Sequence, residues 1–530
     1  MVKGKEAIVV ERNLEKVFLF AEAYKYFHGD RSLMREALGG KGAGLAELTA
    51  SGINVPPGLT LTTACCRSYH ENGGSISAGL FEQVFGLLKS VEKTVGRQLG
   101  SKNNPLLVSV RSGAKFSMPG MMDTVLNLGL NDETVQALAK MTSNERFAFD
   151  SYRRLMQMYG SVVLSMSKDE FEHALSSVKS KANVQTDQEL TIEHLQTLIA
   201  QYKNIVVKAT GKPFEQDVNE QLKAAIEAVF KSWNNTRAIY YRNLNKIDHD
   251  IGTAVNIQAM VFGNLNVRSA TGVCFTRNPN TGENKIYGEY LTNAQGEDVV
   301  AGIRTPKRIA MLADELPEVY KELIATTAKV EKYYTEMQDI EFTIENDRLF
   351  ILQTRTGKHT AAAALKIAVD FINDGVLSKD QALLRIEPGQ LNQLLLPSFT
   401  TVVKDIAKAA GKLLAVGLNA SPGAAHGKIV FDPDRAENMA HQGEKIILVR
   451  VETCPDDVHG IVSAQGVVTS RGGMTSHAAV VARGMGKPCI AGCDALQIDE
   501  SRKEMKVGNN ILKEGEIISR KSIARGLAIE

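Results

Sequence analysis

The sequence lacks the features that mark membrane-spanning, disulfide-stabilised and zinc-clustered proteins. Its six cysteines form no CxxC pair beside histidines, so neither a structural zinc site nor a disulfide framework is indicated. No apolar run approaches the roughly 18 residues that a membrane span needs, and the apolar stretch near the N-terminus is short and interrupted by charges. We therefore expect a soluble chain with reduced thiols and no secretory signal, located in the cytoplasm, with an organelle as the alternative.

An excess of charge of one sign is also absent. The 62 Lys and Arg residues nearly balance the 60 Asp and Glu residues, for a net charge of +2. This balance argues against a nucleic-acid binder that relies on a basic tail. At about 150 residues per domain, the 530 residues predict three or four domains, and they contain no repeat or low-complexity tract.

Changes in hydrophobic periodicity divide the chain. From about residue 131 to 242 the apolar spacing is helical, which indicates an inserted helical subdomain. Strand-like runs separated by turns follow, and residues 359 to 410 resemble amphipathic helices. After Ser421-Pro422-Gly423, strands and helices alternate to about residue 515. The pattern predicts a multidomain protein of mixed α+β and α/β class.

The strongest chemical signal surrounds His477. A strand-like run is followed by a glycine pair, by Thr475 and Ser476, and by good helix formers, which predicts a strand, a tight turn and a short helix. His477 would lie in the first helical turn, where the helix dipole disfavours the imidazolium and attracts phosphate. A neutral imidazole can attack phosphorus. The alternative is an ordinary surface histidine, but the glycine and hydroxyl pairs favour a nucleophile.

Several charged residues beside glycine turns are candidate phosphate or metal ligands. Lys41 lies among glycines, but neither the P-loop spacing nor a preceding strand is present, so a flexible lysine remains. Arg111 follows a strand-like run, where a guanidinium can grip phosphate with two nitrogens. Glu297 and Asp298 suit a metal or a ribose. Each has a purely structural alternative. Lys41 would be a solvated loop lysine, Arg111 would form a surface ion pair, and Glu297 and Asp298 would cap the next segment.

Residues 338 to 355 are typical of a β-hairpin. With a three-residue loop, Glu341 would lie opposite Gln353 and Asp339 opposite Arg355, all on one face. Oxygen-bearing side chains beside an arginine suit Mg²⁺ and a triphosphate.

The loop length decides this arrangement. A two-residue loop at Asn346-Asp347 would instead place Glu341 opposite Leu352 and separate the group. An exposed polar face on an edge hairpin is the purely structural alternative.

These residues resemble those of the pyruvate phosphate dikinases, and the resemblance covers essentially the whole chain. Several long motifs in the same order carry it: Gly39-Gly40-Lys41-Gly42, Ser109-Val110-Arg111-Ser112-Gly113 through Met118-Pro119-Gly120-Met121-Met122-Asp123-Thr124, Gly296-Glu297-Asp298-Val299-Val300, Gln353-Thr354-Arg355, and Gly472 to Gly486. The resemblance implies an ATP-grasp nucleotide-binding domain at about 1 to 358, which holds the helical insertion. A helical linker at 359 to 410, a swivelling phosphohistidine domain at 411 to 512 and a C-terminal tail at 513 to 530 would follow.

The resemblance also implies a chemistry. In that family a histidine takes the β-phosphoryl of ATP as a pyrophosphoryl group, and inorganic phosphate then removes the terminal phosphoryl. The products are AMP, pyrophosphate and phosphohistidine. Carried over by position, the roles are these: His477 as the nucleophile, Lys41, Arg111, Glu297 and Arg355 on ATP, Arg154 on inorganic phosphate, Glu341 and Gln353 on Mg²⁺, and Thr475 as the threonine that is phosphorylated for regulation in the plant enzymes.

The family carries a further C-terminal barrel that binds pyruvate and phosphoenolpyruvate, and the sequence ends at Glu530 before such a segment. We therefore expect this chain to bind ATP and inorganic phosphate, to reach pyruvate only through a barrel elsewhere, to bind neither nucleic acid nor membrane, and to be a monomer. A phosphotransferase with a different acceptor is one alternative, although residues 359 to 410 leave no room for an acceptor domain. A non-catalytic nucleotide-binding regulatory protein is another, although His477, Glu341 and Arg355 are all present.

Overall fold

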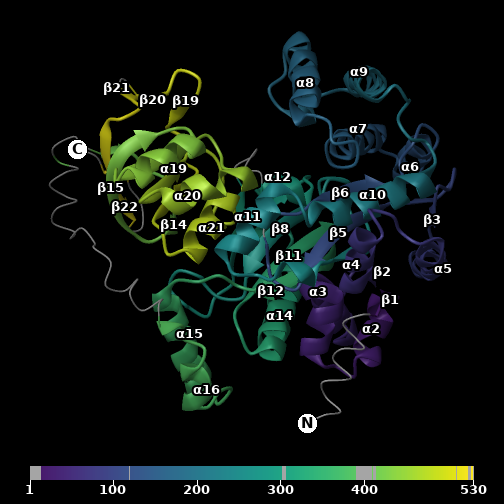
Figure 1. Cartoon of the computed structure of the whole chain (residues 1–530), viewed down its shortest axis with the longest axis horizontal. Helices are drawn as coiled ribbons and strands as arrows, with labels where there is room; N and C mark the ends of the chain where they lie inside the picture. The colour runs from purple at the N-terminus through teal and green to yellow at the C-terminus, as the bar shows by residue number, and fades with distance from the viewer. Residues whose placement is uncertain are drawn as a thin grey trace. The chain divides into compact units, whose positions relative to one another are not determined.

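The computed structural model describes residues 14–118, 120–300, 306–388, 409, 413–508, 510–522 and 527–528. Figure 1 draws the helices and strands along the chain. The chain divides into two compact units. The first comprises Met1–Val261 with Phe350–Gln353, and the second comprises Phe262–Leu349 with Thr354–Glu530. Both contain helices and strands, so the predicted mixed α/β multidomain class is confirmed.

The first unit is built on a five-stranded antiparallel sheet. Its order is β1 (Val17–Leu19), β2 (Gly58–Leu61), β7 (Thr253–Ala259), β5 (Val108–Ala114), β6 (Thr124–Leu128). Every residue of β7 is buried, because helices α3 (Arg31–Ala50) and α4 (Thr63–Glu71) pack against it. Helix α5 (Ala78–Val95) packs on β1 and β2, and the two-residue strands β3 (Gln98–Leu99) and β4 (Pro105–Leu106) pair in parallel.

The segment between β6 and β7 is helical, as its periodicity predicts. It contains α6 (Thr134–Thr142), α7 (Glu145–Val162), α8 (Lys168–Ala182), α9 (Ile192–Thr210), α10 (Val218–Ser232) and α11 (Thr236–Leu244), with 3₁₀ turns at Asp187–Glu189 and His249–Ile251. Side chains of Asn144, Ser167 and Asp217 accept hydrogen bonds from backbone amides and begin three of these helices. Apolar residues on one side of α7 and α9 bury them against each other.

The second unit begins with another five-stranded sheet. Its order is β10 (Lys307–Arg308), β9 (Tyr287–Thr292), β8 (Ala270–Phe275), β11 (Gln338–Glu345), β12 (Arg348–Thr356). Helix α14 (Pro317–Tyr334) packs on β11, preceded by α13 (Leu312–Glu315) and the 3₁₀ turn Ile309–Met311, and α12 (Gly296–Val300) packs on β8 and β9. Helices α15 (Ala361–Asn373) and α16 (Lys379–Leu383) follow, and most of the predicted helical linker beyond residue 388 lies outside the described residues.

The second unit ends in a six-stranded sheet that carries His477. Its order is β14 (Leu418–Ser421), β18 (Cys489–Ala491), β17 (Gly466–Thr469), β16 (Ile446–Arg450), β15 (Gly423–Val430), β22 (Ile517–Ser522). The four strands from β18 to β15 pair in parallel, and both outer strands pair antiparallel. The same part of the chain contains three helices and a 3₁₀ turn: α19 (Pro433–His441), α20 (Val458–Ser463), α21 (His477–Gly484) and Pro455–Asp457. It also contains a three-stranded sheet, β19 (Gln497–Asp499), β20 (Glu504–Val507) and β21 (Asn510–Lys513), and a two-stranded sheet, β13 (Leu413–Ala415) and β23 (Leu527–Ala528).

Alternate residues of the central strands fill two cores. Leu448 and Val467 pack with Ala478 of α21 on one face, and Ile447 and Val449 pack on the other. The sheet extends beyond residue 512, where we expected a tail, because β22 pairs with β15 along six residue pairs.

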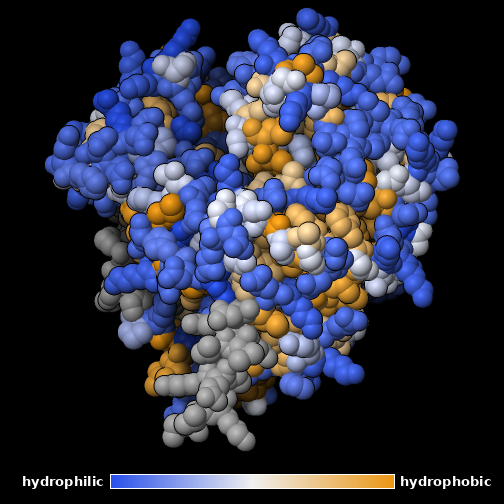
Figure 2. All heavy atoms as spheres, turned by 45° about the vertical axis from the view of Figure 1, so that its right-hand side comes forward, coloured by the Kyte–Doolittle hydropathy of each residue, from blue (hydrophilic) through white to orange (hydrophobic). Residues whose placement is uncertain are grey.

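The described helices do not combine the length with the apolar character that crossing a membrane needs. On the face drawn in Figure 2, hydrophilic residues predominate, and hydrophobic residues are visible between them.

Candidate functional site

Helix α21 begins at His477, so the predicted strand, turn and helix are all present. Gly472 has φ 101°, a conformation that favours glycine, and it turns the chain after β17. Ser476 is the N-cap residue, but its side chain makes no capping hydrogen bond. His477 therefore occupies the first helical position, where amide groups point toward an incoming anion.

The imidazole of His477 is largely withdrawn from solvent. Burial lowers its pKa from 6.5 to about 4, and the nearby charge of Asp456 opposes this only in part. Its Nδ1 lies 3.1 Å from the hydroxyl of Thr453. Within the part of the chain that the structure describes, the buried Nε2 has no hydrogen-bond partner. The ring is therefore neutral at neutral pH and presents one uncommitted nitrogen.

Two residues that sequence reasoning missed contact His477 or the turn before it. Thr453 precedes the 3₁₀ turn Pro455–Asp457, and Glu289 lies on strand β9. Glu289 accepts hydrogen bonds from the Met474 amide at 3.0 Å and from the Thr475 hydroxyl at 3.4 Å. The predicted regulatory residue Thr475 is thus buried against a carboxylate.

In the first unit, three of the predicted site residues lie near one strand. Arg111 lies on β5, and its Nη2 donates a hydrogen bond to the side-chain oxygen of Gln353 at 3.1 Å. Gly113 follows two residues later, on the same face of the strand. A Cβ at Gly113 would lie 3.4 Å from Cβ of Lys41. Helix α3 bends at Gly39, with φ 66° and ψ 175°, and this bend places Lys41 beside β5.

In the second unit, Asp339 and Arg355 form the predicted pair. Nε of Arg355 lies 2.7 Å from Oδ2 of Asp339. The charge of Asp339 is the main cause of a raised pKa for Arg355, and Glu341 contributes in the same direction. Glu341 is two residues after Asp339, so both side chains lie on one face of β11.

The hairpin loop is the two-residue alternative rather than the three-residue one. Strand β11 ends at Glu345 and β12 begins at Arg348, and Asn346 and Asp347 have φ of 50° and 63°. Both central residues of a type I′ turn need positive φ, which Asn and Asp tolerate. The three-residue loop that would have set Glu341 opposite Gln353 is therefore wrong.

The residue pairing between β11 and β12 changes along the hairpin. At the end far from the loop, it differs from the pairing that the two-residue loop sets. A constant register from a two-residue loop would place Asp339 opposite Thr354. Instead Arg355 pairs with Asp339, and the Gly357 amide donates to the Met337 carbonyl. These contacts fit a register shifted by one residue, as a β-bulge produces, and the Asp339 pairing predicted from the longer loop therefore exists for a different reason.

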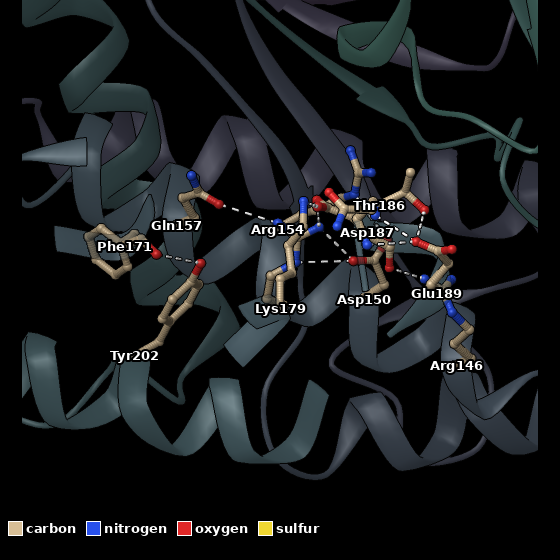
Figure 3. Close-up of polar contacts among 12 residues, drawn as sticks. Arg146, Asp150, Arg154, Gln157, Phe171, Lys179, Thr186, Asp187, Glu189 and Tyr202 are labelled. Carbon is tan, nitrogen blue, oxygen red and sulfur yellow. Dashed lines mark hydrogen bonds and ion pairs between the residues drawn. The ribbon is translucent and has the colours of Figure 1, made fainter. Parts of the chain in front are cut away.

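Arg154 lies on α7 inside a charged network (Figure 3). Its Nε donates to the buried Asp150 at 3.1 Å, and Arg153 donates to the same carboxylate. Although burial opposes it, the charges of Arg153 and Arg154 hold the pKa of Asp150 well below its usual range. Asp187 links this network to Lys179 at 3.0 Å.

Glu297 lies in the short helix α12, and its side chain is outside the described part of the structure. Its neighbour Asp298 accepts a hydrogen bond from the Gln295 amide at 2.9 Å. This contact matches the capping alternative for Asp298.

Known proteins resemble this chain along most of its length. Residues 76–323 and 314–374 match the family described as pyruvate phosphate dikinase, AMP/ATP-binding domain. Residues 442–519 match the family described as PEP-utilising enzyme, mobile domain.

Similar curated proteins are pyruvate, phosphate dikinases. The chain is 50% identical over 510 residues to pyruvate, phosphate dikinase 2 of Zea mays, which covers 96% of this chain and 57% of that protein. It is 49% identical over 497 residues to the pyruvate, phosphate dikinase of Clostridium symbiosum, covering 94% and 56% respectively. The chain spans about half the length of these relatives. Because the AMP/ATP-binding model matches more than half of its residues, the chain belongs to the pyruvate phosphate dikinase family.

Proposed function

We propose that this chain carries the ATP- and phosphate-dependent half of the pyruvate phosphate dikinase reaction, in which ATP, phosphate and pyruvate yield AMP, pyrophosphate and phosphoenolpyruvate. The environment of the His477 imidazole carries the proposal. His477 is neutral at neutral pH, stands first in a helix and has a buried Nε2 without a partner among the described residues. This is the arrangement that nucleophilic attack on phosphorus requires.

The half-reaction has two phosphoryl-transfer steps. Nε2 of His477 attacks the β-phosphorus of ATP, the bond from that phosphorus to the bridging oxygen of the α-phosphate breaks, and AMP leaves. An oxygen of inorganic phosphate then attacks the terminal phosphorus, and the bond from that phosphorus to the oxygen that bridges it to the β-phosphorus breaks. Pyrophosphate leaves, and one phosphoryl group stays on His477. We assign the ring proton to Nδ1, which donates it to Oγ1 of Thr453 and leaves the lone pair on Nε2.

The basic residues would hold the phosphates. Arg111 and Lys41 lie near one face of β5, and cations in such a position neutralise the charge that develops during phosphoryl transfer. Arg355 would act from β12, while Arg154 would bind inorganic phosphate and Glu297 would contact ATP. The Asp150 carboxylate fixes the guanidinium of Arg154.

Mg²⁺ would be bound by oxygen atoms of Glu341 and Gln353. The residues fit this ion, because their donors are carboxylate and amide oxygens and because the buried Oδ1 of Asp339 makes no hydrogen bond to any described residue. Among the described residues, no three His, Cys, Asp or Glu side chains gather as a complete metal site. When bound, Mg²⁺ supplies charge neutralisation to the phosphates, whose oxygens complete its coordination.

We further propose an ATP-grasp fold for residues 1–358 and a swivelling phosphohistidine domain for residues 411–512. The two family matches support this division. Travel of the second domain would carry a phosphoryl group to a distant acceptor site. Monomeric state and cytoplasmic location remain predictions.

Labelled ATP tests the proposal. The protein is incubated with Mg²⁺ and with ATP labelled at the β or at the γ position, with and without inorganic phosphate, and acid-labile, alkali-stable label on the protein is counted. Without phosphate both labels should stay on the protein, whereas with phosphate only the β label should stay. The γ label then leaves as pyrophosphate.

His477→Asn should abolish labelling, and His426→Asn, an exposed histidine on β15, is the matched control. Equal labelling of His477→Asn and wild type would overturn the assignment of the nucleophile. A wild-type protein that binds ATP without becoming labelled would favour the regulatory alternative.

A further inference from the structure

The hydroxyl beside the His477 imidazole comes from a short loop. Strand β16 ends at Arg450, and a 3₁₀ turn begins at Pro455. Residues 451 to 454 lie between them and are called here the Thr453 loop. The hydroxyl of Thr453 lies 3.1 Å from Nδ1 of His477. How the backbone of this loop is held therefore decides where the hydroxyl meets the ring.

A carboxylate from the three-stranded sheet holds the start of the Thr453 loop. Glu500 follows β19, and its Oε1 accepts a hydrogen bond from the Val451 amide at 3.1 Å. Its Oε2 accepts a hydrogen bond from Nη1 of Arg450 at 2.9 Å. The Val451 carbonyl accepts a hydrogen bond from the Arg471 amide at 2.8 Å. Both backbone groups of Val451 are therefore fixed, two residues before the threonine.

A second carboxylate holds the end of the same loop. Oδ2 of Asp457 accepts a hydrogen bond from the Cys454 amide at 2.9 Å, and its Oδ1 lies 3.7 Å from Nη2 of Arg450. Nη1 of Arg450 also donates a hydrogen bond to the Phe431 carbonyl at 2.9 Å. The Arg450 guanidinium thus lies between two carboxylates, Glu500 at the start of the loop and Asp457 at its end.

The exposed fractions of these side chains suit a positioning role. Those of Arg450 and Asp457 are 19% and 7%, so this part of the network is shielded from water. A guanidinium presents its donors in a rigid planar fork, which fixes the directions of both carboxylates. Glu500 is 34% exposed. Water can therefore replace the Glu500 carboxylate, and the fold should survive its removal.

We propose that Glu500 and Arg450 are positioning residues that orient Thr453. The oriented hydroxyl keeps the ring proton of His477 on Nδ1 and leaves the lone pair on Nε2 for attack on phosphorus. This inference rests on the proposed function. A neutral imidazole can carry its proton on either nitrogen, and the hydrogen bond made by one nitrogen decides which. If the loop is released at Val451, the hydroxyl moves, and a ring that carries its proton on Nε2 cannot attack.

Nuclear magnetic resonance of the imidazole tests the orientation without ATP. At neutral pH the protonated and unprotonated ring nitrogens have well-separated chemical shifts, and exchange between the two tautomers averages them. In Glu500→Ala both tautomers should be populated, so the separation between the two His477 nitrogen signals should fall at least twofold. Glu500→Gln keeps an acceptor for the Val451 amide and should retain most of the separation. An unchanged separation in Glu500→Ala would overturn the proposal.

Glu504→Ala is the matched control. This variant removes a carboxylate from β20 of the same three-stranded sheet and leaves Glu500 in place. The nitrogen signals of His477 should remain as in wild type. An effect as large as that of Glu500→Ala would show that loss of any carboxylate from this sheet moves the ring, and it would overturn the specific role of Glu500.

Labelling of His477 connects the orientation to the reaction. Glu500→Ala should lower the rate of labelling from ATP at least fivefold, with the dissociation constant of ATP within twofold of wild type, and Glu500→Gln should recover most of the rate. A loss of ATP affinity as large as the loss of rate would show that Glu500 acts on the nucleotide, and it would overturn the inference. Absence of labelling in wild type contradicts the proposed function alone, since the resonance measurement needs no reaction.

A double-mutant cycle tests whether the two residues act together. Arg450→Lys keeps the positive charge but lacks the planar fork, and it should slow labelling by a factor similar to that of Glu500→Ala. If both residues act through one network, the double variant should be no more than about twofold slower than the slower single variant. Two effects that multiply in the double variant would show independent action and would overturn the joint role.

Discussion

Nδ1 of His477 lies 3.1 Å from the hydroxyl of Thr453, a residue 24 positions earlier in the chain. The hydrogen bond fixes the ring and selects the nitrogen that carries the proton. Thr453→Val should therefore slow labelling of His477 roughly tenfold, which corresponds to about 1.4 kcal/mol, near the upper range for one hydrogen bond. Thr453→Ser keeps the hydroxyl and should label nearly as fast as wild type, and equal rates for the Val and Ser variants would contradict the role.

His477 should remain neutral well below pH 6.5. Its pKa is lowered to about 4 by burial, so the unfolded chain takes up a proton near pH 6.5 while the folded chain does not. His477 therefore lowers the free energy of unfolding below pH 6.5, and this destabilisation becomes larger as the pH falls toward 4.

Nuclear magnetic resonance of the imidazole ring checks this directly. The His477 signal, assigned by its loss in His477→Gln, should not shift between pH 7.5 and 5.5. A histidine in a short unstructured peptide, measured under the same conditions, should titrate near 6.5. A midpoint near 6.5 for His477 would contradict the burial effect.

Gly39 should not tolerate a side chain. Its φ is 66°, and a Cβ there would lie 1.6 Å from the Gly113 carbonyl oxygen. Gly39→Ala should destabilise the first unit by more than the 1–2 kcal/mol that the left-handed conformation alone costs, and it should weaken ATP binding by displacing Lys41.

Gly86 provides the matched control. It lies inside α5, and a Cβ there would meet no atom within 4 Å. Gly86→Ala should stabilise the protein by about 0.5–1 kcal/mol. Denaturation followed by fluorescence of Trp233, the single tryptophan and a residue of the first unit, measures both variants. A stability of Gly39→Ala equal to wild type would contradict the contact.

Asp150 should be essential to the stability of the helical segment. It is 4% exposed and neutralises Arg153 and Arg154. Asp150→Asn removes the charge that both guanidinium groups contact, while Asp187 still lies 3.3 Å from Nη2 of Arg153, so the cost should be about 3 kcal/mol, the lower end for a broken buried ion pair.

An exposed ion pair on the neighbouring helix is the control. Lys168 and Glu172 are separated by four residues on α8, with side chains 69% and 51% exposed. Lys168→Ala should change stability by no more than about 0.5 kcal/mol. Trp233 fluorescence again reports the unfolding. Equal effects of Asp150→Asn and Lys168→Ala would show that the buried network does not stabilise the fold.

Local patterns were sufficient to predict the elements that carry the candidate residues. The helix that starts at His477 follows from glycines, hydroxyl residues and good helix formers within a dozen positions, and strand β5 follows from a short apolar run. Nothing local identifies Thr453 as a partner of His477 or Glu289 as a partner of Met474, because these contacts arise only when distant segments pack. A glutamate inside the otherwise buried strand β9 was the one available signal.

The loop length and the strand pairing of the β11–β12 hairpin could not be predicted from local sequence patterns. Asn346-Asp347 is compatible with a two-residue turn of positive φ, yet the sequence alone left two loop lengths open. The shifted register at Arg355 could not be predicted from either loop, because a bulge depends on what the strand contacts. The Ile351 amide, in the middle of β12, donates to the Asn54 carbonyl, a contact that no local pattern predicts.

Strand β22 protects the parallel sheet from intermolecular pairing. It occupies the outer side of β15 along the residue pairs from Gly423 to Lys428. A truncation at residue 512 would leave that row of backbone amides and carbonyls open, and an unpaired edge is a template for aggregation or strand exchange between molecules. The end of β22 therefore sets the shortest form of the chain in which the histidine-bearing sheet keeps both of its outer strands.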